Sequence, residues 1–448
     1  MQRKPLIRIK LAALALSLLA SVAVSGCADQ SGADMPQQEK ITLSFRHFWV
    51  DEHDLKVANT IEAVINNFET THPHVKIEFE GMNQTIYREQ KLKSEMVAGN
   101  PPDIIPLFGG GEIEPYVRAG RLVDLTDFLE QNGLKSAFKN LDLWTFHNKV
   151  YGLPMEGNAE PLYYNKKIFA SLHLNPPKTI DDLFAAIPVL KKAGYIPFAL
   201  QNKDRWTGAI FYHYFLQRYG GNERIENILT KDGSFVNADY LQATKDFAKL
   251  IELGAFPDGA NELTKEYAVN LFTSRKAAMY LNGSWDIGLF QGNNADLLFR
   301  DEVGVVNFPV APVGKEDAGA LAGGYTFGIG LSANLKGARL KAAEELLKAI
   351  YTEEVQRELV YEAMRIPSMN ISFDAAKTGP IFPQVIDLIE HSKHTFIPYD
   401  NILPPEVKQT FLEVVKDLID QTTTPEAVLA KLQESLELYR SLVQDGKH

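Results

Sequence analysis

The chain has 448 residues, 45% of them apolar, with a net charge of −11 and a single cysteine, Cys27. This length exceeds what one hydrophobic core usually serves, so two lobes or domains are expected. The acidic balance argues against nucleic-acid binding, and a single thiol excludes internal disulfides and sites built from several thiolates.

The first 26 residues have the features of a secretory signal. Residues 1–10 carry four basic residues and no acidic one, and residues 11–24 are apolar except for two serines. That apolar run is shorter than the roughly 20 residues of a membrane span. Val24-Ser25-Gly26-Cys27 resembles the lipobox of bacterial lipoproteins, which implies cleavage before Cys27 and a diacylglycerol on its thiol. The alternative is a cleaved signal followed by an incidental cysteine.

Cleavage would leave 422 residues, and the loss of four basic residues would lower the net charge to −15. Residues 27–40 would form the lipidated Cys27 and a polar, flexible tether. We therefore expect a protein held by lipid on the outer face of the cell membrane. A fold without disulfides, tethered in this way, favours a Gram-positive surface over a periplasm.

Strand and helix patterns alternate from residue 41 onward. Period-two alternation predicts strands at 41–45 and 75–79, and a mostly apolar run predicts a third at 103–107. One apolar face predicts a helix at 57–68, and Gly99 and Pro101 close a second helix expected at 85–96. This β-α-β-α-β order predicts a largely parallel sheet covered on both faces. Further helices are expected at 115–118, 125–131, 180–192, 208–219, 241–253, 265–273, 342–363, 382–391, 405–421 and 425–443, and further strands at 150–154, 160–166, 195–200, 277–281, 303–309 and 323–330.

Sequence motifs for catalysis, metal binding or phosphate binding are weak. The sequence contains no G-x-S-x-G elbow and no H-E-x-x-H motif. The close histidine pairs at 72–74 and 391–394 lack acidic or thiol partners, so surface histidines are the better interpretation and no metal is expected. The glycines at 109–111 and 323–330 lack the lysine of a phosphate loop, and predict close approach of the backbone to a ligand or to a crossing strand.

Three tryptophans lie beside expected strand ends, where open α/β sheets place ligands. They are Trp49, Trp206 and Trp285. An aromatic plate can stack on the apolar face of a sugar ring while polar side chains bind the hydroxyls. Core packing is the alternative for each tryptophan. Candidate polar contacts are His47, Asn83, Gln84, Glu156, Asn158, Glu160, Asp286 and Arg365, and for each of these a plain surface role stays open.

Several strings, taken in order, resemble family 1 of the extracellular solute-binding proteins of bacterial ABC importers, the carbohydrate-binding group. They lie at residues 97–105, 151–154, 162–169, 275–285 and 323–325. The resemblance implies an α/β, periplasmic-binding-protein-like II fold, with two hinge-linked lobes joined by about three crossings and a sugar in the cleft between them. Each lobe would hold a mixed, mostly parallel sheet covered by helices.

The resemblance also implies boundaries and roles. Lobe 1 would comprise 41–157 plus about 325–368, and lobe 2 about 158–324 plus 369–448. Trp285 would be a stacking platform, Trp206 a second plate, and residues 156–160 a polar contact. The strand at 323–325 adds Gly324 and Tyr325 to the ligand-binding candidates. One departure is Gly109-Gly110-Gly111, where maltose-binding relatives have a charged pair that binds sugar hydroxyls.

The sequence therefore predicts a lipid-anchored binding protein that delivers a sugar or oligosaccharide to an ABC permease. We expect a monomer without cofactor, metal or enzymatic activity. One alternative keeps the scaffold and binds a peptide, a polyamine, or a ferric or phosphorylated solute. The other is a surface glycosidase with two carboxylates, such as Glu156 and Asp286.

Overall fold

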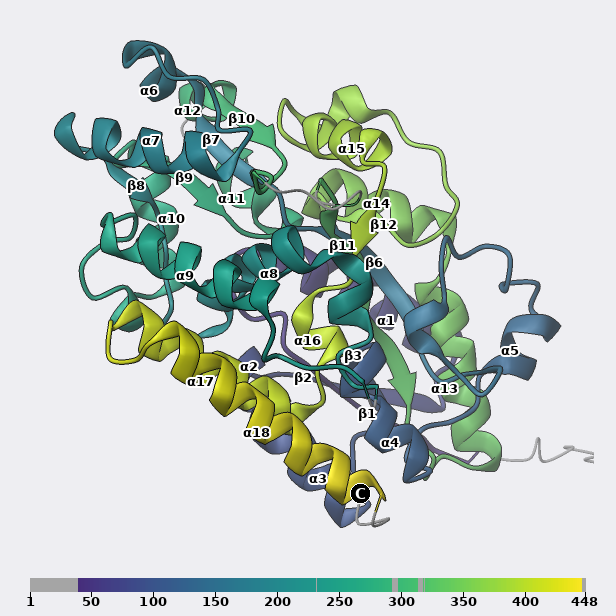
Figure 1. The fold of residues 1–448 in the computed structure, drawn as a ribbon. Helices are drawn as coiled ribbons and strands as arrows, with labels where there is room; N and C mark the ends of the chain where they lie inside the picture. The colour runs from purple at the N-terminus through teal and green to yellow at the C-terminus, as the bar shows by residue number, and fades with distance from the viewer. Residues whose placement is uncertain (1–38, 231, 292–296, 313–316, 318, 445–448) are drawn as a thin grey trace, which may run out of the picture. The chain divides into compact units, whose positions relative to one another are not determined.

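A seven-stranded and a four-stranded β-sheet form the framework of the fold (Figure 1). The computed structural model describes residues 39–230, 232–291, 297–312, 317 and 319–444, so the predicted signal and Cys27 lie outside the described residues. Within the described ranges, no helix combines the length and the apolar character needed to cross a bilayer.

The larger sheet is mixed, with strand order β12-β6-β11-β3-β1-β2 and β13 paired to β11. Strands β1, β2 and β3 are parallel, as the β-α-β-α-β pattern predicts, but β11 runs antiparallel to β3 and β6. Its strands are β1 (Ile41–His47), β2 (Val75–Gly81), β3 (Ile104–Phe108), β6 (Leu153–Ala159), β11 (Leu321–Leu331), β12 (Ile366–Pro367) and β13 (Thr395–Phe396).

The smaller sheet has the order β10-β7-β9-β8, and only β8 and β9 pair in parallel. The expectation of mostly parallel sheets is therefore wrong, because strands from distant parts of the chain enter both sheets in the reverse direction. The strands of this sheet are β7 (Leu162–Asn165), β8 (Ile196–Phe198), β9 (Ala277–Leu281) and β10 (Val303–Val306), and a separate hairpin joins β4 (Thr145–Phe146) to β5 (Lys149–Val150).

Helices cover the larger sheet through apolar faces. The face predicted for 57–68 is buried at Val57, Ile61, Ile65 and Phe68 of α1. These side chains share one hydrophobic core with β1, β2 and β3. The elements of this part are α1 (Leu55–Thr71), α2 (Gln84–Ile86), η1 (Tyr87–Lys91), α3 (Leu92–Ala98), η2 (Gly110–Glu112), α4 (Glu114–Arg118), α5 (Thr126–Gln131), η3 (Asp142–Trp144), α13 (Gly337–Ile350) and α14 (Glu353–Ala363).

Helices from two distant parts of the chain share a second core. In Figure 1, α17 and α18 lie side by side and pack against α8 and α9. The elements of this part are α6 (Lys166–Ser171), α7 (Ile180–Lys192), α8 (Trp206–Glu226), α9 (Ala238–Glu252), η4 (Ala260–Glu262), α16 (Tyr399–Ile402), α17 (Pro405–Ile419) and α18 (Pro425–Gln444). A third core holds buried side chains of α10 (Lys265–Thr273), α11 (Ile287–Gln291), α12 (Leu297–Glu302) and α15 (Phe382–His391). The short helices η5 (Ser284–Asp286) and η6 (Ala375–Thr378) precede α11 and α15 in the sequence.

The helix expected at 342–363 is interrupted. It is two helices, α13 and α14, because the side chain of Thr352 accepts a hydrogen bond from Val355 N–H and so caps a new helix. The short helix α16 lacks a local signal and was not expected. It begins directly after Pro398 and its residue Tyr399 is buried in the second core.

The glycine stretch at 109–111 lies in close contact with another backbone segment, but that segment is the helix α16 and not the ligand or crossing strand that was expected. A Cβ atom on Gly110 or Gly111 would overlap the carbonyl oxygen of Asn401 or Ile402. The side-chain amide of Asn401 donates to Gly109 O at 2.8 Å. A side chain at these positions is therefore excluded by backbone atoms, which cannot move aside as a flexible side chain can.

We expect Gly111→Ala to lower the free energy of unfolding by about 1–3 kcal/mol, because the added methyl group displaces α16. Urea unfolding measures this loss. Gly288→Ala is the matched control, since a Cβ at Gly288 meets nothing within 4 Å. Equal stability of the two variants would mean that η2 and α16 are not in tight contact.

Candidate ligand-binding cavity

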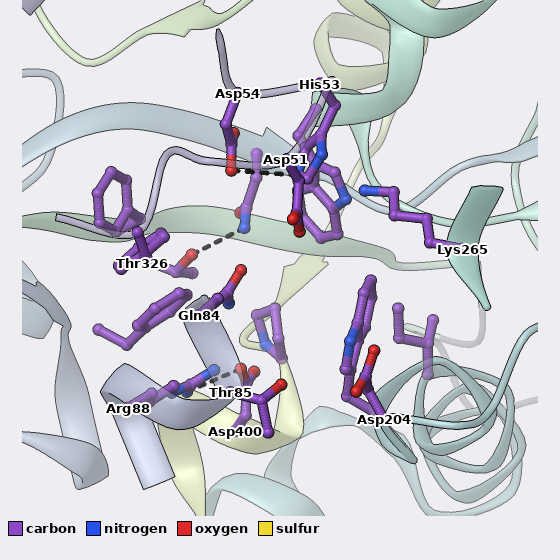
Figure 2. A pocket seen from close by; sticks show the side chains of 18 of the residues that line it. Asp51, His53, Asp54, Gln84, Thr85, Arg88, Asp204, Lys265, Thr326 and Asp400 are labelled. Carbon is purple, nitrogen blue, oxygen red and sulfur yellow. Dashed lines mark hydrogen bonds and ion pairs between the residues drawn. The ribbon is translucent and has the colours of Figure 1, made fainter. Parts of the chain in front are cut away.

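A cavity of about 350 Å³ is lined by residues that follow β1, β2, β8 and β9, together with residues of β3, β6, β11 and the C-terminal segment (Figure 2). Open α/β sheets place ligands at strand ends in this way. The volume falls at the lower end of the range for small-ligand sites, about 300–1,000 Å³.

Nine of the thirteen residues predicted to bind ligand line this cavity. They are Trp49, Asn83, Gln84, Glu156, Asn158, Glu160, Trp206, Trp285 and Arg365. They come from segments far apart in the sequence, so the fold brings them together. His47, Asp286, Gly324 and Tyr325 do not line the cavity.

His47 belongs to an aromatic core. Its ring stacks against Trp49 at 5.2 Å and Phe79 at 4.0 Å between centroids. Burial lowers its pKa to about 4, so the imidazole is neutral at physiological pH. His47 therefore supports Trp49 from behind.

Asp286 lies in a layer behind the cavity wall. Its carboxylate is fully buried and accepts hydrogen bonds from Tyr280 Oη at 2.7 Å and from Asn282 Nδ2 at 2.8 Å. It also pairs with Lys265 Nζ at 2.6 Å, and Lys265 lines the cavity. Asp286 thus fixes Lys265, and of the Glu156–Asp286 pair named for the glycosidase alternative only Glu156 faces the cavity.

Gly324 and Tyr325 have a structural role in the larger sheet, where β11 pairs with β6. Gly324 pairs with Asn158 in the ladder between β11 and β6. The ring of Tyr325 packs over Gly157, and its carbonyl oxygen accepts from Trp144 Nε1 at 2.8 Å. Their backbone positions hold β6, which carries Glu156 and Asn158 into the cavity.

The tryptophans differ in exposure. Trp206 and Trp285 are half-buried, with ring centroids 6.1 Å apart and planes at 58°. Trp49 is only 2% exposed and packs against Phe45 and Phe327. Trp206 and Trp285 therefore offer aromatic surface to a ligand, whereas most of Trp49 is core.

Arg365 organises one group of charges at the cavity wall. Its guanidinium contacts Asp54 Oδ1 at 2.6 Å and Glu156 Oε2 at 3.5 Å. Burial raises the pKa of Glu156 to about 7, against the opposing effect of Arg365. Burial also raises the pKa of Asp54, with Arg365 and Lys265 opposing the rise.

Arg88 and Lys408 organise a second group. Arg88 Nε donates to both carboxylate oxygens of Glu112, at 2.8 and 2.7 Å, and Arg88 Nη2 pairs with Asp400 at 3.0 Å (Figure 2). Lys408 Nζ, which is 2% exposed, contacts Glu112 at 2.8 Å and Glu89 at 3.0 Å. This charge network, of Arg88, Glu89, Glu112, Asp400 and Lys408, joins η1 and η2 to α16 and α17.

Two buried amide oxygens at the cavity lack a hydrogen-bond donor. Asn158 Nδ2 donates to Thr326 Oγ1 at 2.7 Å, and Gln201 Nε2 donates to Thr207 Oγ1 at 2.6 Å. Asn158 Oδ1 and Gln201 Oε1 accept no hydrogen bond from any of the described residues. A buried acceptor without a donor is energetically unfavourable. A ligand hydroxyl or amine that donates to it therefore contributes the full free energy of that hydrogen bond.

Sequence reasoning missed several lining residues. Asp51, His53 and Asp54 follow β1, and Gln201 follows β8. Because these polar residues follow the ends of predicted strands, the strand-end rule could have identified them as ligand-binding candidates. The C-terminal residues Asp400 and Lys408 had no local signal, because they reach the cavity from more than 290 residues away.

Metal ligands do not gather in the described part of the chain, where no three His, Cys, Asp or Glu side chains are placed to hold an ion. His72 and His74 have ring centroids 6.4 Å apart, and His391 Nδ1 contacts its own helix at Asp387 O.

Comparison with known proteins gives a consistent result. The model of the bacterial extracellular solute-binding protein family matches residues 55–357, more than half of the chain. An ABC transporter extracellular-binding protein of Pyrococcus horikoshii is 29% identical over 298 residues, 65% of this chain and 66% of that protein. The multiple sugar-binding protein of Streptococcus mutans is 24% identical over 361 residues, 78% of this chain and 80% of that protein.

A chitin oligosaccharide binding protein of known structure superimposes with a TM-score of 0.86 at 29% identity, covering 89% of this chain and 99% of that one. The α/β fold expected of periplasmic binding proteins, with mixed sheets and covering helices, is thereby confirmed.

The raised pKa of Glu156 gives a testable pH dependence. Between about pH 4.5, its ordinary pKa, and about 7, the unfolded chain releases this proton while the folded chain retains it. Wild-type stability should therefore fall relative to Glu156→Gln by up to about 1.4 kcal/mol per pH unit in that window, and level off above it. Urea unfolding across this range measures the difference. The exposed Glu78→Gln control should follow the wild type, and a parallel course of Glu156→Gln and wild type would contradict the assignment.

Proposed function

Since the chain belongs to the family of bacterial extracellular solute-binding proteins, we propose that it captures a sugar or short oligosaccharide in this cavity and delivers it to the permease of an ABC importer. The family consists of binding proteins, and function requires no covalent chemistry. The names of the Streptococcus mutans relative and of the chitin oligosaccharide binding protein support a saccharide ligand.

One observation carries the proposal: the Trp206–Trp285 pair borders the same cavity as the unpaired acceptors Asn158 Oδ1 and Gln201 Oε1. A pyranose ring has an apolar face that stacks on an indole, and a rim of hydroxyls that donate to amide oxygens. A lipid chain would pack on the indoles but would leave the two amide oxygens without a donor.

We propose two lobes with the predicted boundaries, 41–157 plus about 325–368 and about 158–324 plus 369–448. In this arrangement Trp49 and Gln84 belong to one lobe, and Trp206 and Trp285 to the other. A ligand that contacts both lobes binds the closed form better than the open one, so it shifts the population toward closure. The permease would recognise the closed form.

We propose that Cys27 carries a diacylglycerol on the outer face of the cell membrane. Two acyl chains give stable anchoring, whereas one gives only marginal binding. Residues 28–40 would then act as a tether of polar composition that keeps the cavity near the permease.

Isothermal calorimetry with xylo-, arabino-, malto-, galacto- and manno-oligosaccharides tests the proposal. We expect one series to bind with a micromolar Kd, about −8 kcal/mol, which allows both capture and release. Trp285→Ala should weaken that binding by about 2 kcal/mol through loss of the stacking surface. Tyr267→Ala removes an aromatic ring that is 51% exposed and off the cavity, so it should bind like the wild type. The saccharide assignment fails if no series binds.

Cys27→Ser tests the anchor. The wild-type protein should sediment with the membrane fraction of a Gram-positive host, and the variant should appear in the medium, because serine offers no thiol for the lipid. Ser25→Thr, a control that keeps the cysteine, should leave the protein in the membrane fraction. Retention of Cys27→Ser in the membrane fraction would rule out lipidation at this residue.

A further inference from the structure

Four of the five lysine and arginine side chains that line the cavity are already paired. Within the described residues, Arg88 pairs with Glu112 and Asp400, Lys408 with Glu89 and Glu112, Arg365 with Asp54, and Lys265 with Asp286. The fifth, Lys203, is exposed. An anionic solute would therefore find little uncompensated positive charge in this cavity.

Four acidic side chains that line the cavity, by contrast, have no ion-pair partner among the described residues. Asp51, Glu160, Asp204 and Glu266 line the cavity, and none has a lysine, arginine or histidine within ion-pair distance in the described part of the chain. Asp51 is half-buried at the rim, and burial raises its pKa, with Lys265 opposing and Glu266 and Asp204 adding to the rise. Asp51, Asp204 and Glu266 therefore face one cavity without an ion-pair partner among the described residues, and Glu160 joins them as a carboxyl group whose pKa burial raises well above its usual range.

Glu160 is the buried member of this set. It is 4% exposed, it lies between β6 and β7, and its carboxyl group has no hydrogen-bond or ion-pair partner among the described residues. A buried carboxyl without a partner is unfavourable unless a ligand supplies one. Gln201, 1% exposed, adds an unpaired acceptor oxygen to the same lining. The Glu160 carboxyl group and Gln201 Oε1 both lack a partner that a hydrogen-bond donor on a ligand could supply, and neither contacts a positively charged side chain among the described residues.

Aromatic surface adjoins the acidic rim. Asp204 stands two residues before Trp206, which pairs with Trp285. Indole faces attract cations, and a carboxylate beside them strengthens that attraction. Carboxylates, unpaired acceptors and indoles together match a ligand that carries ammonium groups on sugar rings.

We propose that the solute is a short oligosaccharide of basic amino sugars, whose ammonium groups bind the unpaired carboxylates Asp51, Glu160, Asp204 and Glu266. The inference rests on the proposed function, because it keeps a saccharide in the cavity and specifies its charge. The ammonium N–H groups donate to the carboxylates and to Gln201 Oε1, while the sugar rings meet Trp206 and Trp285. Acidic sugars are excluded by the same four carboxylates.

Calorimetry with three disaccharides of the same linkage separates charge from shape. They are cellobiose, di-N-acetylchitobiose and fully deacetylated chitobiose. We expect the deacetylated sugar to bind at least about tenfold more tightly than either neutral one. This preference should shrink as salt concentration rises, because the rim carboxylates are solvent-accessible. Galacturonic acid dimers should not bind.

Charge-removing variants identify the groups responsible. Asp204→Asn, at an exposed position that does not endanger folding, should reduce the preference for deacetylated chitobiose over cellobiose about threefold or more. Glu160→Gln should reduce it further. Glu78→Gln removes one exposed carboxylate away from the cavity and should leave the preference unchanged.

The outcomes distinguish this inference from the proposed function. Equal or tighter binding of cellobiose or di-N-acetylchitobiose would overturn the amino-sugar inference and leave sugar binding intact. Binding of spermidine without binding of any saccharide would overturn both. A preference that survives in both Asp204→Asn and Glu160→Gln would also overturn the assignment, because the charge would then be recognised elsewhere.

Discussion

The charge network of Arg88, Glu89, Glu112, Asp400 and Lys408 is the interaction on which the cavity depends. It fixes η1, which continues from the helix turn that carries Gln84, against the segment that begins α16 and α17. Loss of one member of such a buried group leaves a charge uncompensated, at about 3–5 kcal/mol. The glycines at 109–111 allow the backbone contact beside it. The segment with η1 and η2 and the segment with α16 and α17, which are distant in the sequence, are thereby held together at the cavity wall.

The residues that sequence reasoning placed correctly at the cavity are those close to the end of a strand. Asn83, Trp206 and Trp285 each lie within about eight residues of a strand that ordinary alternation reveals, so the strand-end rule applies to them. The charge network has no such signal. Arg88 and Asp400 are 312 residues apart, and nothing in either neighbourhood specifies the other. The same limitation explains why the antiparallel entry of β11 into the larger sheet was not predicted.

Trp49 and Trp285 show why a local pattern alone does not identify a ligand contact. Each follows a strand and stands beside polar residues, yet Trp49 is nearly buried and Trp285 is half-exposed. The difference comes from neighbours on other strands. Phe79 of β2 and Phe327 of β11 enclose the ring of Trp49, whereas Trp206 is the aromatic neighbour of the half-buried Trp285, at 6.1 Å between ring centroids. The exposure of each tryptophan ring therefore depends on residues from other strands, which its own local sequence does not specify.

Two cationic side chains of the cavity wall, Lys265 and Arg365, are fixed by ion pairs within the protein itself. Asp286 fixes Lys265 from behind with the help of Tyr280 and Asn282, and Asp54 fixes Arg365. Side chains that are ordered in advance lose less entropy when a ligand binds. The same pairing neutralises these cations, so they shape the cavity without adding net positive charge to it. A solute that enters this cavity therefore meets cations that are already neutralised and carboxylates that, among the described residues, have no ion-pair partner.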